Sequence, residues 1–239
     1  MNATGPMNKV RVGFFSFTEV TDPGQHRSYN EWHQLDHMPE QYPLPGIAFG
    51  QRWVSTPACR AARAADEELL RPIHYVTLYL MTEPVEETLS EFMELGRRLS
   101  RLGRFHRHRR AHLSGPFQLA ETYAAPRVLV SAEAVPYRPN RGVYVVVEEG
   151  AGDAVPPPVE VRPVLETAGV AGVWAFTERA GRAGAAGRRI TVCYLDGEPV
   201  EVAGGLRPVL EARWREGRAR PVLAGPFESI TPWRWDWFD

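Results

Sequence analysis

Residues 29–53 of the chain, YNEWHQLDHMPEQYPLPGIAFGQRW, decide the fold because they place a short helix directly before a strand. Ser28 can cap the helix, since a glutamate follows three residues later at the spacing of a capping box. Pro39 predicts the end of the helix, since a proline disfavours helical geometry in the residue before it. His37 should then lie in the last turn, with His33 one turn earlier on the same face. We expect a histidine-bearing helix that packs on a sheet.

Further strands and a second helix surround this unit in the first half of the chain. Runs of apolar residues predict the strands, and apolar residues at helical spacing predict a long helix with an acidic start and a basic end. The strands are expected at residues 9–17, 46–54, 73–81 and 117–123, and the long helix begins at residue 84. The order strand-helix-strand-strand-helix-strand is the ferredoxin-like arrangement.

The second half of the chain repeats segments of the first half in the same order. The matched pairs are PGIAFGQRWV from Pro45 with AGVAGVWAFT from Ala168, YLMTEPVE from Tyr79 with YLDGEPVE from Tyr194, and SGPF from Ser114 with AGPF from Ala224. Three matches in one order indicate an internal repeat, whereas one match alone would be weak. We therefore expect an α+β fold with two tandem ferredoxin-like repeats.

The predicted domains are repeat 1 at residues 8–124, a linker with an extra strand at 125–141, and repeat 2 at 142–239. Each repeat has one apolar sheet face, so the two are expected to pack sheet to sheet as an internal dimeric α/β barrel. A ligand cavity is expected between the sheets. The segment of repeat 2 that corresponds to the first helix, residues 150–168, contains neither tryptophan nor histidine. The helix that carries Trp32, His33 and His37, called here the Trp-His helix, therefore occurs once in the chain.

Composition excludes several classes of partner. The 28 Lys and Arg residues are balanced by 29 Asp and Glu, which gives a formal net charge of -1 and no general attraction to nucleic acid or to a membrane surface. No apolar run approaches the roughly 18 residues of a membrane span, and the N-terminus lacks the apolar segment of a secretion signal. Cys59 and Cys193 have no metal-site spacing and are interpreted as free thiols. These features predict a cytoplasmic protein.

Two segments of biased composition favour structural roles. The basic run Arg104–His112 is interpreted as the solvated end of the long helix. The C-terminal Trp233, Trp235 and Trp237 alternate with charged residues, which predicts a strand with three indoles on one face. Such a face would belong to the core or to an interface in a homo-oligomer, or would form one wall of the cavity.

The run WHQLDHMPE followed by LPGIAFGQRW resembles the pattern W-x4-H-[LM]-P-E…PG-x4-[QR]-R-[WY] of the dimeric α/β-barrel superfamily, in particular its EthD-like members. The resemblance implies a ligand-binding barrel, with His37 and Trp32 as the matching histidine and aromatic residue. Members of the superfamily include cofactor-independent polyketide cyclases, muconolactone isomerases and quinone-forming monooxygenases. Among chains with two repeats, they include haem proteins related to chlorite dismutase. Repeat 2 departs from the pattern throughout its first helix.

His37 is the first candidate catalytic residue, as a general acid or base, and His33 is its candidate partner. The alternative for His37 is that it only caps the helix. The two histidines could also form a metal pair, with Asp36 or Glu40 as third ligand, although this spacing fixes no third ligand. The alternative for His33 is a solvated helix face.

The candidate substrate-binding residues are Trp32, Tyr42, Arg52, His74 and Tyr75. Tyr42 and Arg52 could bind an enolate or a carboxylate, but an arginine in a strand is more often an exposed ion-pair partner. His74 lies in an apolar strand and faces either the cavity or the core. Tyr75 lies on the opposite face of that strand.

These residues predict a cofactor-independent enzyme of the cyclase, isomerase or dehydratase type, acting on a small apolar or aromatic carbonyl compound. The alternatives are a haem-binding oxidoreductase of the two-repeat type and a non-catalytic small-molecule-binding protein. The leading hypothesis requires neither a metal nor another cofactor. The expected partners are a small-molecule ligand and, in a homo-oligomer, copies of the chain itself.

Overall fold

The computed structural model describes residues 8–150, 154–178 and 187–238, and within them nine strands form one antiparallel sheet in the order β2-β4-β1-β5-β7-β8-β6-β9-β3. An additional pairing of β2 with β9 joins the two ends of the eight long strands. The strands are β1 (Val10–Val20), β2 (Ile47–Val54), β3 (Ala65–Asp66), β4 (Tyr75–Thr82), β5 (Arg109–Ala124), β6 (Gly142–Glu149), β7 (Val170–Glu178), β8 (Arg188–Leu195) and β9 (Arg220–Ser229). The eight long strands therefore form a closed ring.

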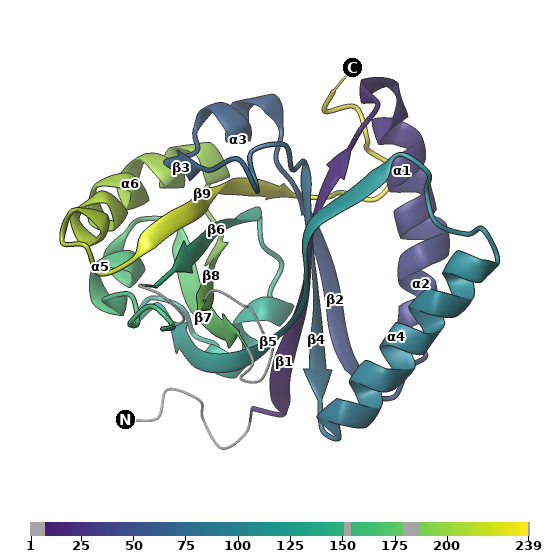
Figure 1. Cartoon of the computed structure of the whole chain (residues 1–239). Coiled ribbons are helices and arrows are strands. Elements are labelled where there is room, and N and C mark those ends of the chain that lie inside the picture. Colours follow the sequence, from purple (N-terminus) through teal and green to yellow (C-terminus); the bar gives the residue numbers. More distant parts are fainter. Residues whose placement is uncertain (1–7, 151–153, 179–186, 239) are drawn as a thin grey trace.

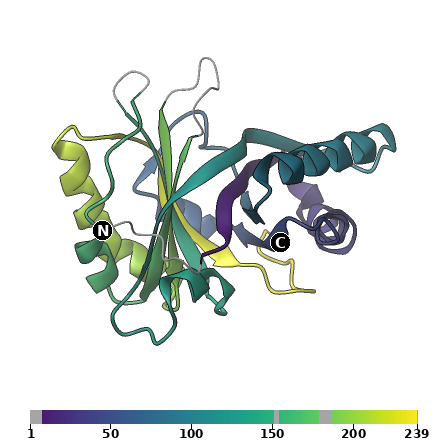
Figure 2. The same ribbon diagram turned by 90° about the horizontal axis from the view of Figure 1, so that it is seen from below.

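Helices cover the outside of this ring on two sides (Figures 1 and 2). On one side lie α1 (His26–Trp32), the π-helix His33–His37, α2 (Met38–Gln41) and α4 (Val85–Arg101). On the other lie α3 (Pro57–Ala61), α5 (Val161–Glu166) and α6 (Pro199–Arg215), and two 3-10 helices span Pro23–Gln25 and Ala132–Tyr137. The predicted α+β class is confirmed. In the described part of the chain, no helix is long and apolar enough to cross a membrane.

The strand order is the same in the two halves of the sheet. It is β2-β4-β1-β5 in the first half and β7-β8-β6-β9 in the second, and the strands in matching places carry the sequence segments that repeat. The two halves meet through the pairs β5–β7 and β2–β9. The tandem ferredoxin-like repeats and their boundaries stay predictions, which this order supports.

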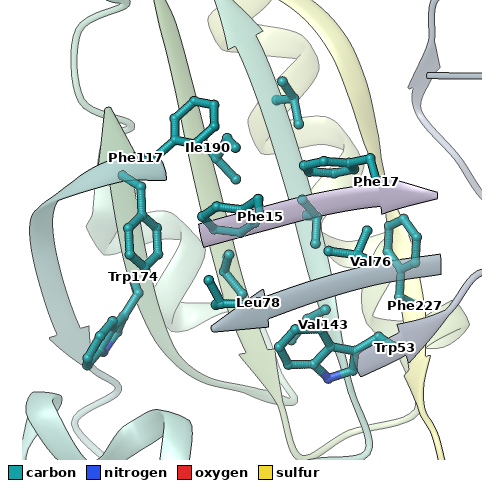
Figure 3. Close-up of a cluster of buried hydrophobic side chains, with 14 of the residues drawn as sticks. Phe15, Phe17, Trp53, Val76, Leu78, Phe117, Val143, Trp174, Ile190 and Phe227 are labelled. Atoms are coloured by element: carbon teal, nitrogen blue, oxygen red, sulfur yellow. The ribbon is translucent and has the colours of Figure 1, made fainter. Parts of the chain in front are cut away.

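The interior of the ring is a packed apolar core, so the expectation of a ligand cavity between the sheets is wrong. Figure 3 shows the interior side chains, which include Phe15, Phe17, Trp53, Val76, Leu78, Phe117, Val143, Trp174, Ile190 and Phe227. Large rings from both halves fill the space, and Phe15 packs edge-on against Phe176 with 5.1 Å between ring centroids. Strand side chains alternate between faces, so the polar neighbours of these residues point outward.

The first helix differs from the prediction at both ends. It begins at His26, after a 3-10 turn in which the side chain of Asp22 accepts a hydrogen bond from the amide of Gly24, and not after Ser28. Pro39 does not end it, because the helix continues as a π-helix and then as α2. A proline ring ordinarily clashes with the carbonyl four residues earlier, and the wider π turn relieves this clash.

Three further expectations are corrected. The long helix ends at Arg101, before Gly103 adopts a left-handed conformation with φ of 68°, and the end of the basic run begins β5. Residues 125–141 contain a 3-10 helix in place of the extra strand. The tryptophan-rich C-terminus is not a strand. Its indoles do not share one face, because Trp233 is exposed whereas Trp235 is buried and Trp237 packs near Tyr29. The single indole face that suggested a homo-oligomer interface is therefore absent from the described residues.

Candidate functional site

A cavity of about 450 Å³ lies on the outer face of the sheet, under the Trp-His helix and α4, and is called here the outer cavity. Strands β1, β4 and β5 form its floor, and its walls come from the helices and from the loop between α4 and β5. The floor residues are Phe14, Ser16, Thr77, Tyr79, Arg109 and Ser114, and the walls contain His33, His37, Gln41, Phe92, Met93, Gly96, Arg97, Ser100, Phe105 and His106. Both histidines predicted as catalytic therefore line one cavity, but on the side of the sheet opposite to the predicted one.

The π-helix gives the histidines their arrangement. Their rings lie edge to face with 5.2 Å between centroids, and Trp32 stacks on His37 at 4.8 Å. The amide of Met38 bonds to the carbonyl of His33, five residues earlier, so the turn that carries both histidines is wider than an α-helical turn. The indole N–H of Trp32 donates to the carbonyl of Arg104 at 2.7 Å. Trp32 thus holds His37 from behind and is not among the residues that line the outer cavity.

The predicted third metal ligands point elsewhere. Arg104 bonds to the carboxylate of Asp36 at 2.9 Å and to that of Glu40 at 2.7 Å. In the described part of the chain, no group of three or more His, Cys, Asp and Glu side chains could hold a metal ion. The two histidines therefore lack the third protein ligand that a metal site would need.

Both histidines are held in the neutral form. Burial lowers the pKa of His37 to about 4, and the charge of Arg109 adds to this effect while Asp36 opposes it. Burial also lowers the pKa of His33 well below its usual value, with a further contribution from the guanidinium of Arg52. A neutral imidazole has one nitrogen that can accept a proton.

Several buried polar atoms around the outer cavity have no hydrogen-bond partner among the described residues. They are Nδ1 of His33, His37 and His106, Oε1 of Gln41, Oγ1 of Thr77 and the hydroxyl of Tyr79. Leaving a buried donor or acceptor unpaired costs about 1–3 kcal/mol, so a group of such atoms needs an explanation. Their concentration in one place marks the outer cavity as the candidate site.

Arg52 lies behind this site, only 4% exposed, and is not an exposed ion-pair partner. One terminal nitrogen donates to the side-chain oxygen of Asn30 at 2.9 Å, and the guanidinium lies over the rings of Tyr29 and Tyr75. Its Nε and Nη1 atoms have no partner among the described residues. Arg52 is thus a buried cation whose charge reaches the histidines without lining the outer cavity.

The remaining predicted binding residues lie outside the outer cavity. Tyr42 donates to the carbonyl of Gly50 at 3.0 Å and, with Arg52, lines a second cavity of about 290 Å³ beside the C-terminal segment. Nδ1 of His74 accepts from the amide of Val20 at 3.2 Å. The structure therefore does not bring Tyr42 and His74 together with the histidine pair.

Tyr75 does not line the outer cavity, and its hydroxyl is held by hydrogen bonds to α1. Its hydroxyl lies 2.9 Å from Nδ1 of His26 and accepts from the side-chain amide of Asn30, also at 2.9 Å. Phe238 of the C-terminal segment stacks on His26 with 3.7 Å between ring centroids. These contacts anchor the start of the Trp-His helix.

Sequence reasoning missed the polar floor of the outer cavity. Thr77 and Tyr79 could have been found from their alternation with Val76 and Leu78, but alternation does not say which face meets a cavity. The basic run that contains Arg109 predicts only a solvated helix end. The position of Arg109 at the start of β5 places it in the cavity.

No family model matches the chain, and no curated protein matches it. Among solved structures, a candidate chlorite dismutase is 9% identical with a TM-score of 0.52, over 93% of this chain and 95% of that one. A mutant chlorite dismutase from Candidatus Nitrospira defluvii, in complex with cyanide, is 11% identical with a TM-score of 0.46, over 92% and 91% of the chains. A candidate monooxygenase from Lactobacillus acidophilus is 8% identical with a TM-score of 0.38, over 91% and 96%. The first similarity shows a shared fold, and the other two are too distant to support an argument.

Proposed function

We propose that the chain is an enzyme that removes a proton from a small, partly aromatic compound bound in the outer cavity, with His37 as the general base and His33 as its partner. The observation that carries the proposal is the buried pair of neutral imidazoles on the cavity wall. A base must be unprotonated to accept a proton, and lowered pKa values keep both rings in that form at neutral pH.

The surroundings of the histidines suit the anion that proton removal leaves behind. The hydroxyl of Tyr79 and the side chain of Thr77 are hydrogen-bond donors on the cavity floor, and burial raises the pKa of Tyr79, so its proton is retained. Arg52 and Arg109 add positive charge nearby. Donors and charges placed before the reaction stabilise an enolate or a phenolate.

The fate of this anion separates the predicted reaction types. Cyclisation, isomerisation or dehydration uses the anion directly, whereas an oxygenase lets it react with dioxygen. The fold shared with a candidate chlorite dismutase supports oxidoreductase chemistry more than a cyclase, isomerase or dehydratase. Proton removal by His37 is common to these routes and is the part that we propose.

Deuterium exchange tests the proposal. 1-Tetralone, an aromatic ketone, is incubated with the protein in deuterium oxide, and deuterium at the carbon beside its carbonyl is followed by NMR. Wild-type protein should accelerate the exchange, and His37→Ala should lower the acceleration by about 10²- to 10⁴-fold. His108→Ala is the control, because His108 does not line the outer cavity. Equal exchange with wild-type and His37→Ala protein would contradict the proposal.

A haem-binding oxidoreductase is the second candidate, because the fold is shared with a candidate chlorite dismutase. His33, His37 and Tyr79 line the outer cavity and are of residue types that ligate haem iron. A ligating histidine ordinarily donates its other ring N–H to a carboxylate or carbonyl, and Nδ1 of both histidines lacks such a partner among the described residues. The cavity therefore fits an organic substrate better than haem.

The absorption spectrum separates the two candidates. A Soret band in the purified protein, or one that develops with one equivalent of added haemin and is lost in His37→Ala or His33→Ala, would favour the haem-binding oxidoreductase. A spectrum of free haemin after the addition would favour the first proposal.

We also infer that the two halves are tandem ferredoxin-like repeats of the dimeric α/β-barrel type, as the EthD-like sequence pattern implies. The equal strand order in the two halves supports this inference. Under it, residues 8–124 form the repeat that carries the site, and residues 142–239 form a repeat kept for architecture.

A further inference from the structure

We propose that the substrate of the outer cavity is an organic acid, whose carboxylate binds Arg109 and the hydroxyl groups beside it while its flat apolar body packs against phenylalanine rings. The inference rests on the proposed function for the place of the reaction. It adds the chemical class of the substrate.

The charges that line the outer cavity are all positive. Among the described residues, its lining contains the guanidinium groups of Arg97 and Arg109 and no Asp or Glu side chain. Arg97 is paired with Glu94 at 2.9 Å. Arg109 has no carboxylate within ion-pair distance among the described residues, and its contacts are the hydroxyl of Ser16 at 3.4 Å and the ring of Phe105 at 5.4 Å. Arg109 is therefore a cation without an anionic partner inside the cavity.

A row of hydroxyl groups crosses the cavity floor beside Arg109. Thr77 of β4 is paired directly with Ser16 of β1, and Ser16 is paired with Ser114 of β5. All three line the outer cavity and are called here the hydroxyl row. Directly opposed residues on neighbouring strands have side chains about 4.5–5.5 Å apart on the same face. The row can donate hydrogen bonds to the oxygen atoms of a carboxylate that pairs with Arg109.

The apolar part of the lining is aromatic. The rings of Phe14 and Phe92 lie 4.7 Å apart on one side, and the ring of Phe105 lies 5.1 Å from His37. Aromatic walls favour a flat ring system, which they contact edge-on or in offset stacking. A ring held between these walls, with its acid group at Arg109, lies beside the proposed base.

The sequence around the cavity also favours an anion. Residues 97–112 contain seven arginines and no acidic residue, in a chain whose net charge is -1. Arg97, Phe105 and Arg109 of this segment line the cavity. A local excess of one sign of charge raises the concentration of oppositely charged ligands near a site.

A carboxylate fits these features better than a phosphate ester. One guanidinium without an ion-pair partner balances a single negative charge, and the neutral hydroxyls add hydrogen bonds but no charge. A phosphate monoester brings a charge of about -1.5 to -2 at neutral pH. We therefore assign a monocarboxylate.

The test compares two ligands that differ in charge. Binding of 2-naphthoate and of its neutral analogue 2-naphthamide is measured by isothermal titration calorimetry. Wild-type protein should bind the acid about tenfold more tightly or better, the range of a charge-assisted hydrogen bond. Arg109→Gln should remove this preference, and Arg109→Lys should keep part of it, because lysine keeps the charge but not the fork of donors.

Arg110→Gln is the matched control, because Arg110 is the next residue, is exposed and is paired with Glu19. It should keep the preference of the wild type. Circular dichroism of each variant checks the fold, and Arg109→Lys serves as the test if Arg109→Gln does not fold. Equal affinities of the wild type for the two ligands, or an unchanged preference in the Arg109 variant that folds, would overturn the inference.

The two proposals can fail separately. His37→Ala should keep the preference for 2-naphthoate, because His37 does not hold the carboxylate. If that variant keeps both the preference and wild-type deuterium exchange, the proposed function fails and the assignment of an acid stands. If deuterium exchange depends on His37 but no preference is seen, only the assignment of an acid fails.

Discussion

The outer faces of the two sheet halves have the same strand order and opposite character. On the first half, Thr77, Ser16 and Ser114 form the hydroxyl row of a cavity of about 450 Å³. On the second half, the same pairing positions are held by Thr191, Val146 and Ala224, and the cavity that Thr191 lines has about 10 Å³. One fold thus carries a polar cavity on one side and a packed apolar layer on the other.

The segment between the first and second strands of each half accounts for much of this difference. In the first half it is the Trp-His helix, which the π turn holds with histidines toward the sheet. In the second half, Val159, Val161 and Val164 pack into the equivalent space. The difference teaches that two halves with the same strand order can differ in their outer face through one connecting segment.

The two halves also treat charge differently. In the second half, Glu148 and Arg213 are buried and paired at 2.9 Å, and the indole N–H of Trp214 donates to the same carboxylate. In the first half, Arg52 is buried and Arg109 lines the cavity, and neither has a carboxylate partner among the described residues. A buried cation without an anionic partner lowers the stability of the fold, but it is available to bind an anion.

The largest expected effect is on stability, from Glu148→Gln. This change leaves Arg213 as a buried cation without its anionic partner, so we expect a loss of about 3–5 kcal/mol in the free energy of unfolding, measured with urea. Arg104→Ala is the matched change in the first half, where the ion pairs are more than one-third exposed and screened by solvent, and should cost much less. Similar losses for the two variants would contradict the contrast between the halves.

A second prediction fills the outer cavity. Gly96 lies in α4 and lines the cavity, and a Cβ atom added there would have open space around it. Gly96→Leu should weaken the binding of 2-naphthoate roughly 100-fold, about 2.7 kcal/mol, while the helix becomes more stable by up to about 1 kcal/mol. Gly204→Leu makes the same change in open space on α6 and should leave binding unchanged. Unaltered affinity in Gly96→Leu would place the ligand elsewhere.

A third prediction exchanges one residue between the two faces. Ser114→Ala removes a member of the hydroxyl row and should weaken 2-naphthoate binding several-fold, about 0.5–1.5 kcal/mol, with little change in stability. Ala224→Ser places a hydroxyl in the fully buried layer of the second half and should cost about 1–3 kcal/mol of unfolding free energy without affecting binding. Weaker binding in Ala224→Ser, or unchanged binding in Ser114→Ala, would contradict this difference between the two faces.

The smallest expected effect is on the dependence of stability on pH. The pKa of His37 is about 4 in the folded chain, below its usual 6.5, because of burial and the charge of Arg109. As the pH falls from about 6.5 towards 4, the unfolded chain binds this proton before the folded chain does, so the free energy of unfolding decreases. His37→Gln should reduce the slope of the unfolding free energy against pH by up to the equivalent of one bound proton. Urea unfolding at several pH values measures this slope. A steeper decrease in the variant would contradict the lowered pKa.

The same lowered pKa predicts the acid limb of the proposed reaction. In the free enzyme the base stays unprotonated down to a pH of about 4, so kcat/KM for exchange should stay level from neutral pH and fall only near that value.

The sequence by itself determined the long strands, the apolar alternation within them and the pairing of His33 with His37 on one helical face. These features depend on contacts between residues close in the chain, so local spacing is enough to predict them. The matched segments also indicated which strands take the same place in the two halves. The extension of the helix past Pro39 was beyond local rules, because a π turn and a packed sheet together accommodate the proline.

Only the tertiary structure decided which face of β4 meets the cavity and that Arg109 belongs to it. Alternation shows that Thr77 and Val76 lie on opposite faces, but the inner face is chosen by ring closure through β5–β7 and β2–β9. These strands are far apart in the sequence, and closure leaves the interior full of large side chains from both halves. The proposed substrate site therefore lies outside the ring, because large side chains fill the inside.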